Sequence, residues 1–489
     1  MEKSKIVAGI ILGSFILIIG ASCKDYLDLS PISSYNAGSF YVTQSDFNLA
    51  VNGAYSELQS LYENNLFYTL EARSDNVDTD TEYDYGIVSK FTDNATTSEL
   101  LTVWERFWIL VDRCNAIIDQ IDDGTFDDES YRSYYKGEAH FLRGYAYFQL
   151  GCLYGGMPLI DHQMKVSEIK TTARSTQGET FDFAASDLEQ AAGLLPGSWS
   201  SSELGKATKY AAEGILARLC LFQGKYAEAK SLLTDIISSG KYEMASDYEN
   251  CFLDSHDISS EHVFQIQFTS GGQGNAVPEA SAPEQIKSEL FPQSGKSSFL
   301  KVSDDLYDSY ESGDLRRDIS VQKGYLNNAG VVDLVTCFYI KYAHGTTSTT
   351  KYDRDVNLPI LRYTDVKLMY AEVLNEEGYH AVGDAFSVLN EVRNRSGLSS
   401  LSSAEVPDQE TFRYALMQER RSEFAFEALR WFDLVRTGKA LSVINTFLSR
   451  ADQESGKYKM HDYQKIFAIP QDELNNNPDT DYMWQNPEY

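Results

Sequence analysis

The stretch that decides the fold is LARLCLFQGKYAEAKSLLTDIIS, residues 216–238. Apolar residues recur at helical spacing on both sides of Gln223-Gly224, a dipeptide that favours a turn. Ala229 is a small residue at the point where two packed helices must touch. The stretch therefore predicts two helices that are joined by a tight turn and packed together.

Two weaker copies of this pattern lie elsewhere in the chain. In 360–397, LRYTDVKLMYAEVLNEEG leads through a turn to DAFSVLNEVRNRSG, and 137–195 holds two more helical stretches across a longer connection. Small residues that let paired helices pack are typical of tetratricopeptide repeats. Because the copies are irregularly spaced, we expect a mostly α-helical globular fold that contains repeats, and not an open solenoid.

Two regions lack helical periodicity. Residues 62–103 are polar, and residues 240–359 hold the alternating runs EHVFQIQF (261–268) and LVTCFYIKY (334–342), with loop composition at SGGQGN (270–275). The alternation predicts short strands within a loop-rich insertion. Since binding residues often lie on loops that a rigid scaffold positions, we expect ligand contacts in 62–103 and 240–359.

Residues 1–22 are predicted to be a lipoprotein signal peptide. Lys3 and Lys5 precede an apolar run over 6–19, which is too short to span a bilayer, and small residues precede Cys23. Cys23 is therefore expected to be the lipidated first residue of a single mature domain, 23–489. The alternative is an ordinary signal peptide followed by a coincidental cysteine.

Composition excludes some functions. The chain has 489 residues and a formal net charge of −30, which would repel nucleic acid and favours neutral or cationic ligands over strongly anionic ones. With 43% hydrophobic residues, the chain can bury a large core. The five cysteines beyond Cys23 stand too far apart to indicate a disulfide framework, and Cys114, Cys152 and Cys220 are predicted to be buried.

No motif in the sequence predicts catalysis, a metal or a cofactor. The histidines form no HExxH cluster, and the acidic run Asp78 to Asp84 lacks the glycine and the glutamate of an EF-hand loop, since Tyr83 and Ser89 stand in their places. A solvated acidic loop is favoured there over bound calcium. A pair of glycosidase carboxylates can be neither found nor excluded among 72 acidic residues.

The segment 415–436, ALMQERRSEFAFEALRWFDLVR, combines charged and aromatic residues. Four pairs of opposite charges are three residues apart, namely Arg420–Glu423, Glu427–Arg430, Arg430–Asp433 and Asp433–Arg436. That spacing brings side chains together along a helix. The segment predicts a largely buried helix with structural ion pairs.

Several blocks together resemble one protein family. They are CKDYLDLSP (23–31), NGAY (52–55), GEAHFLRGYAYFQL (137–150), GGMPLI (155–160), LRYTDVKLMYAEVLNE (361–376) and QERRSEFAFEALRWFDLVRTG (418–438). In this order they are similar to the SusD/RagB family of Bacteroidetes outer-membrane lipoproteins. The resemblance runs from Cys23 to Tyr489.

The resemblance implies a helical scaffold of tetratricopeptide-type units with loops that carry the ligand surface. It further implies a cell-surface protein, without catalytic activity or cofactor, that binds glycans or other nutrients. Such a protein acts as a lid on a SusC-like TonB-dependent transporter.

The choice of candidate site residues rests on the chemistry of sugars, because a sugar ring has both flat C–H faces and hydroxyl groups. Aromatic platforms beside polar side chains suit such ligands. The predicted ligand contacts are Asp75, Asn76, Tyr83, Asp84, Tyr85, Phe291, Tyr325 and Tyr342. Two other hypotheses remain at this point: a lipid-anchored glycoside hydrolase, and a helical-repeat scaffold or adhesion protein.

Overall fold

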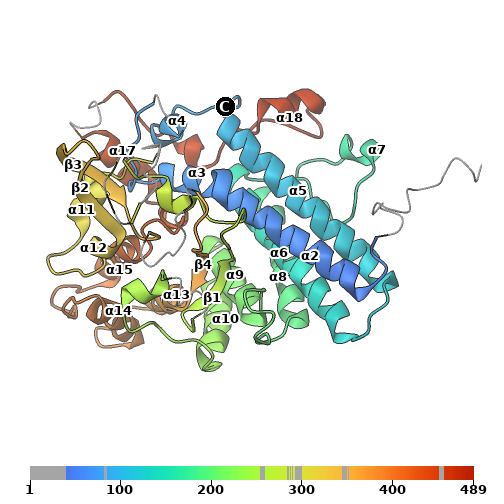
Figure 1. The fold of residues 1–489 in the computed structure, drawn as a ribbon, viewed down its shortest axis with the longest axis horizontal. Helices are drawn as coiled ribbons and strands as arrows, with labels where there is room; N and C mark the ends of the chain where they lie inside the picture. Colours follow the sequence, from blue (N-terminus) through green and yellow to red (C-terminus); the bar gives the residue numbers. More distant parts are fainter. Residues whose placement is uncertain are drawn as a thin grey trace, which may run out of the picture.

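The computed structural model describes residues 40–81, 85–253, 259–283, 286, 288, 290–291, 300–343, 350, 352–450 and 456–489. Cys23, Tyr83 and Asp84 lie outside the described residues. Helices make up most of the structure, and the strands are few and short (Figure 1). The predicted mostly α-helical class is confirmed.

Long helices form one side of the molecule, on the right in Figure 1. They are α2 (Gln44–Leu61), α5 (Ser98–Gln120), α6 (Ser130–Tyr154) and α8 (Gln177–Leu194). Helix α6 packs against both α5 and α8, and α2 packs against α5. At Gly144 the approach of α8 is so close that a Cβ would lie 3.0 Å from the Ala184 carbonyl oxygen. Only glycine fits there without a shift of the neighbouring helix.

The predicted helix pair in 216–238 is confirmed. It consists of α9 (Lys209–Phe222) and α10 (Tyr226–Ser238), with Gly224 in the turn at a φ of +71°. Ala229 is fully buried, as the packing of two helices requires. Helix α10 also packs against α13 (Tyr363–Glu377), which in turn pairs with α14 (Asp384–Arg395).

In the described part of the chain, two antiparallel pairs of strands make up the sheets. Strand β1 (His262–Ile266) is antiparallel to β4 (Leu358–Arg362), and β2 (Val321–Leu326) is antiparallel to β3 (Val332–Tyr339). Both predicted strands are confirmed. The remaining short helices are α3 (Phe67–Ala72), α4 (Gly86–Ser89), α7 (Val166–Ile169), α11 (Asp304–Ser309), α12 (Arg317–Ser320), α17 (Ala440–Leu448) and α18 (Gln471–Asn476).

The segment 415–436 differs from its prediction, because it forms two helices. Helix α15 (Gln409–Glu423) ends before residues 424–429, and α16 (Arg430–Arg436) begins after them. Phe426 and Ala428 adopt left-handed backbone angles, with φ of +62° and +59°, which a continuous helix cannot contain.

The predicted ion pairs of this segment are largely replaced by long-range ones. Asp433–Arg436 forms as predicted, with 2.7 Å between Nη2 and Oδ1. Arg420, by contrast, pairs with Asp365 of α13 at 2.6 Å and with Asp433 at 2.8 Å. The charges are structural, but most of them join different elements instead of neighbouring turns.

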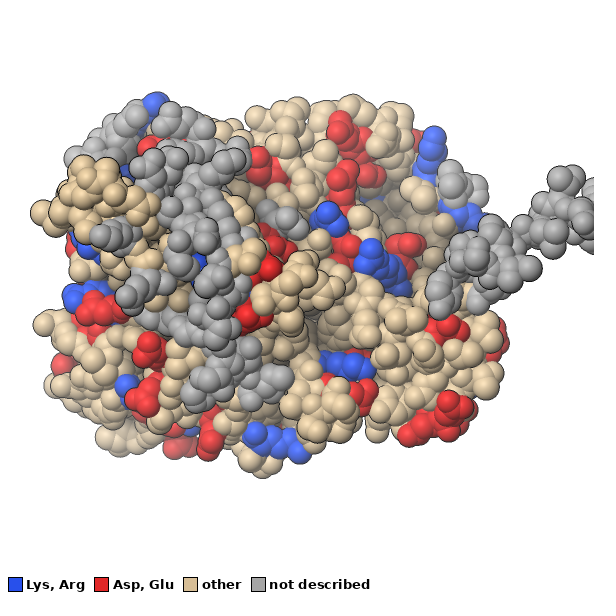
Figure 2. Space-filling view, viewed as in Figure 1, with Lys and Arg blue, Asp and Glu red and all other residues tan. Residues whose placement is uncertain are grey.

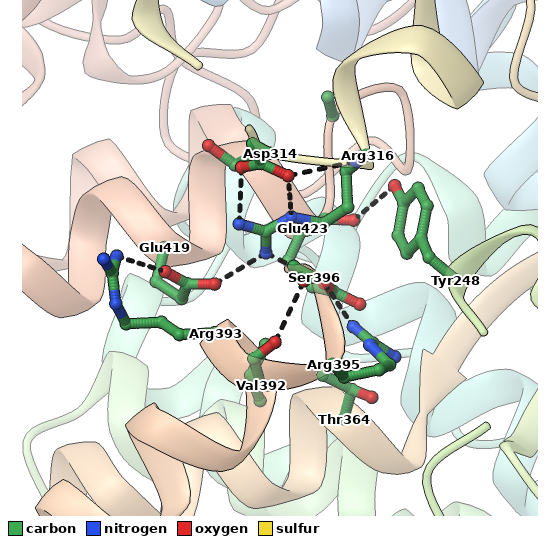
Figure 3. Close-up of polar contacts among 12 residues, drawn as sticks. Tyr248, Asp314, Arg316, Thr364, Val392, Arg393, Arg395, Ser396, Glu419 and Glu423 are labelled. Carbon is green, nitrogen blue, oxygen red and sulfur yellow. Dashed lines mark hydrogen bonds and ion pairs between the residues drawn. The ribbon is translucent and has the colours of Figure 1, made fainter. Parts of the chain in front are cut away.

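Glu423, the last residue of α15, is the centre of a buried charge cluster. Its side chain is fully buried and forms ion pairs with Arg316 at 3.1 Å and with Arg395 (Figure 3). A third ion pair joins it to Arg362 at 2.9 Å. Burial would raise the pKa of Glu423, but the three guanidinium groups outweigh it and hold the pKa well below its ordinary value. We call Arg316, Arg362, Arg395, Glu419 and Glu423 the charge cluster.

The cysteines can also be compared with their prediction. Cys114, Cys152 and Cys220 are buried free thiols, as predicted, and so are Cys251 and Cys337. In the described part of the chain, no helix combines the length and the apolar composition that crossing a membrane requires.

Removing the charge of Glu423 tests the energetic weight of the cluster. In a Glu423→Gln variant, three buried arginines lose a shared counter-charge. We therefore expect the free energy of unfolding to fall by about 3–5 kcal/mol. Chemical denaturation followed by circular dichroism measures this change.

A matched control lies on the same helix. Glu410 is exposed and pairs with Arg413 and Lys439 at the surface. Glu410→Gln should leave the unfolding midpoint almost unchanged, because water solvates all three charges. Equal effects of the two substitutions would contradict the assigned role of the cluster.

Candidate functional site

The two loop regions that the sequence singles out lie side by side. The backbone at Asn76 to Asp78 runs antiparallel to residues 301–303, with Val77 opposite Val302. The Asp78 N–H donates to the Lys301 carbonyl at 2.8 Å, and the Ser303 N–H donates to the Asn76 carbonyl at 2.9 Å. Segments more than 200 residues apart in sequence thereby form one surface.

A π-helical turn, η2 (Tyr62–Leu66), interrupts the path from α2 to α3. Such turns are rare and occur often at functional sites. Asn65 in this turn donates its Nδ2 to the Tyr85 hydroxyl at 3.2 Å. Glu63 is half-buried, and its pKa is raised by burial and by the nearby charge of Asp353.

Asp353 holds the loop 270–275. The carboxylate of Asp353 accepts the backbone N–H groups of Gly271 at 2.8 Å, Gly272 at 3.1 Å and Gly274 at 2.9 Å. These bonds lower the pKa of Asp353. Tyr352, next to it, has a left-handed φ of +58°, which is strained for a tyrosine.

We call Glu63, Asn65, Tyr85, Tyr352, Asp353 and the loop 270–275 the loop face. It combines two tyrosines, an amide and two carboxylates from both predicted regions. The π-helical turn η2 and the strained backbone at Tyr352 are both unfavourable locally. They persist because contacts with the rest of the structure stabilise them. The half-buried Tyr352 can stack on an apolar surface, and the amide and the carboxylates can hydrogen-bond hydroxyl groups. Tyr85 is 6% exposed and packs on Tyr68 in the core, so it supports Asn65 from below the surface.

Asp75 and Asn76, predicted as ligand contacts, lie in the interior beneath the loop face. Asp75 pairs with Arg430 at 2.8 Å and with Arg421 at 3.1 Å, and Arg421 also donates to Asn76 Oδ1 at 3.0 Å. Burial would raise the pKa of Asp75, but the two arginines outweigh it and lower the pKa. Both side chains position the 75–78 segment, and their burial argues against the predicted direct contact with a ligand.

Phe291 and Tyr342 are each 1% exposed, which argues against direct ligand contact for them as well. Tyr342 donates its hydroxyl to the Phe426 carbonyl at 2.7 Å, and Phe291 packs edge-to-face on Phe338. Tyr325 is half-buried and packs on the same Phe338 ring. Tyr85 is 6% exposed, and its burial argues against direct contact in the same way. Ligand contact by Tyr83, Asp84 and Tyr325 stays a prediction.

Sequence reasoning missed Glu63, Asn65, Tyr352 and Asp353. One signal was present, because the sequence ENN at 63–65 places two poor helix formers inside an apolar helical pattern. Asp353 gave no local signal, since its partners lie about 80 residues earlier. Among the described residues, no group of three or more His, Cys, Asp or Glu side chains could hold a metal ion.

Comparisons with known proteins point in one direction. Residues 319–489 match the model of the SusD family, and residues 25–221 match a SusD-like family described as "Starch-binding associating with outer membrane". A SusD-like protein of Formosa agariphila is 26% identical over 91% of this chain and 94% of its own length. This chain belongs to the SusD-like family.

Solved structures agree with the assignment of the SusD-like chain. The surface glycan-binding protein A of Bacteroides fluxus is 26% identical, with a TM-score of 0.78, over 92% of this chain and 100% of its own. A laminarin-binding SusD-like protein is 25% identical, with a TM-score of 0.76, over the same shares. The fold and the chain order of the family are thus present throughout.

In the SusD-like chain, the 424–429 segment beneath the loop face is held by residues from the loop regions. Glu71 of α3 accepts the N–H of the left-handed Ala428 at 2.7 Å, and Lys341 donates to the Ala425 carbonyl at 2.8 Å. Glu71 is fully enclosed, and burial raises its pKa to about 8. At neutral pH this carboxyl is therefore mostly protonated.

The raised pKa of Glu71 predicts a pH dependence of stability. The folded protein retains a proton that the unfolded chain releases above its ordinary pKa of 4.5, so this contribution is full below pH 4.5 and declines as the pH rises through 8. A Glu71→Gln variant keeps a neutral acceptor for the Ala428 N–H. Its stability relative to the native protein should increase from pH 5 to about pH 8 and then level off.

Urea titrations at four or five pH values measure that difference. Glu410→Gln is the control, because an exposed carboxylate is ionised throughout this range in both states. A Glu71→Gln difference that stays constant with pH would show that the native carboxyl is ionised when folded.

Proposed function

We propose that this protein is a non-catalytic, surface-anchored lipoprotein that binds oligosaccharides or polysaccharides and delivers them to a SusC-like TonB-dependent transporter. The observation that carries the proposal is the similarity along almost the whole chain to proteins named for glycan and laminarin binding. The family description adds the association with the outer membrane. The lipidated Cys23 would supply the anchor.

The loop face supports this function chemically. Tyr352 brings a half-buried aromatic ring and Asn65 brings an amide to the loop face, where the buried Tyr85 holds the amide through its hydroxyl. Sugars need this mixture, since their C–H faces stack on rings and their hydroxyl groups need both donors and acceptors. Tyr83, Asp84 and Tyr325 are further proposed contacts.

Two other functions compete with the proposal. A lipid-anchored glycoside hydrolase would release shorter sugars, and a scaffold or adhesion protein would bind no nutrient. A panel of polysaccharides, tested by affinity electrophoresis and calorimetry with analysis of the products, separates the three. Retention of a polysaccharide without shortening supports the proposal, whereas shortened products or the absence of any binding contradicts it.

Removal of a predicted platform tests the site. Tyr83→Ala should weaken binding of the retained glycan by about 1–3 kcal/mol, by analogy with the stacking of nucleic-acid bases on aromatic side chains. Calorimetry measures the affinity. Tyr414, 62% exposed on α15, gives the matched control Tyr414→Ala, which should leave affinity unchanged. Unchanged binding by Tyr83→Ala would remove that residue from the site.

The proposed partner can be tested separately. An affinity-tagged chain, extracted with mild detergent from the outer membrane of its own bacterium, should co-purify with a TonB-dependent β-barrel transporter. A Cys23→Ala variant should be absent from the membrane fraction. Membrane association of that variant would contradict the lipid anchor.

A further inference from the structure

A second hollow lies between α2 and strand β1 and borders the loop face at Gln273. Its third wall is the loop 202–206 that follows α8. Two adjoining cavities of about 450 and 420 Å³ share residues 204–206 and Gln265 and Gln267, and so form one groove. Each is within the range of volumes of ligand pockets. Figure 2 shows a hollow near the middle of the face on which α2 lies.

One wall of the groove is a polar stripe on α2. Asn48, Asn52, Ser56 and Gln59 recur at i, i+4, i+8 and i+11, which places them on one side of the helix. Asn52 and Ser56 are exposed, and Asn48 is half-buried. Primary amides both donate and accept hydrogen bonds, as the hydroxyl groups of a sugar do.

The facing wall is also rich in amides, contributed by Gln265, Gln267 and Gln273. Gln267 is held firmly, because its Oε1 accepts from Asn357 at 2.9 Å and its backbone carbonyl accepts from Gln59. Its Nε2 is buried and has no hydrogen-bond partner among the described residues. A buried donor without a partner is costly, and a ligand hydroxyl would satisfy it.

The backbone of Gly205 packs directly against this amide. The residue has a φ of +96°, and a Cβ there would lie 2.7 Å from Cδ and 3.0 Å from Nε2 of Gln267. Glycine is thus required twice, by the backbone angle and by the side chain beneath it. The loop passes directly over the donor without covering it with a side chain.

The other end of the groove offers apolar surface. Leu204 is 47% exposed, and Trp199 and Tyr242 are half-buried beside it. Trp199 is fixed in place, since its Nε1 donates to the Ala207 carbonyl at 2.8 Å and Tyr134 packs edge-to-face on its ring. Fixed rings and an exposed leucine suit the flat C–H faces of sugars.

The groove is close to electrically neutral. Lys206 pairs with Glu203 at 3.2 Å and lies 3.9 Å from Glu138. Burial lowers the pKa of His262 to about 4, so this imidazole is uncharged at pH 7. Lys241 adds one positive charge at the outer end. An uncharged, hydroxyl-rich ligand fits this wall better than a polyanion.

From these contacts we propose that the groove between α2 and β1 is a second binding site, which takes a neutral oligosaccharide. The inference rests on the proposed glycan-binding function and adds a site that borders the loop face at Gln273 but has its own walls on α2, β1 and the loop 202–206. We call it the amide groove, defined by Asn48, Asn52, Gln59, Trp199, Leu204 and Gln267.

Blocking the groove tests the proposal. In Asn52→Trp a large ring replaces an exposed amide in the polar stripe, and Asn48→Ala/Asn52→Ala removes two amides without filling space. Asn476→Ala, an exposed asparagine at the end of α18, is the matched control. Thermal unfolding followed by circular dichroism verifies that each variant folds. If the tryptophan variant does not fold, the double alanine variant still tests the site.

Calorimetry with neutral hexasaccharides of glucose (laminari-, malto- and cello-linked), xylose and mannose, and with an oligogalacturonate, gives stoichiometry and affinity. We expect Asn52→Trp to lose one binding event per chain, and the double alanine variant to bind about tenfold more weakly at one site. Hydrogen exchange of residues 200–207 should slow when the native protein binds the sugar.

The outcomes are distinguishable. If folded groove variants bind like the native protein, the amide groove is refuted while glycan binding stands. Tighter binding of the oligogalacturonate in the groove would refute the neutral ligand class. If the native protein binds no glycan at all, both this inference and the proposed function fail.

Discussion

The buried charge of Glu423 is the interaction on which the rest of the structure depends. Arg316 precedes α12, Arg362 ends β4, Arg395 ends α14, and all three meet Glu423 at the end of α15. A carboxylate at the C-terminal end of a helix interacts unfavourably with the negative end of the helix dipole. The three arginines compensate for this interaction. Moving any one of the four elements would leave a buried charge unpaired, which fixes their mutual positions.

Buried ion pairs and hydrogen bonds also hold the segments near the loop face. Arg430 and Arg421 hold Asp75, and Glu71, Lys341 and Tyr342 hold the 424–429 segment. Left-handed Phe426 and Ala428 are strained positions that persist because these neighbours bind their backbone groups. Charged residues in the interior therefore position the loops, and the surface of the loops is left for recognition.

Periodicity in the sequence was enough to predict the helix pair around Gly224, the burial of Ala229 and strands β1 and β3. These features depend on residues within a few turns of one another, so local patterns carry them. The predicted continuous helix over 415–436 was wrong. The charges have the i, i+3 spacing of ion pairs along a helix. Glu423 and Arg420 nevertheless form their ion pairs mainly with residues of other helices and strands. Asp75 and Tyr342 look like surface residues for the same reason, because their partners Arg430 and Phe426 are distant in sequence.

The sequence by itself determined the helical scaffold and the class of the fold, because hydrophobic spacing and turn residues act over short distances. The expectation of a non-helical region over 62–103 was wrong in part, since η2, α3, α4 and the start of α5 lie within it. Only the tertiary structure decided which polar side chains are interior ties and which face solvent. Asp75 and Arg430 are 355 residues apart, and the amide groove joins α2 to the loop 202–206 and to β1. The sequence does not distinguish a polar residue that forms an interior ion pair from one that faces solvent. Its neighbours in space alone determine whether its charge is buried and paired or open to a ligand.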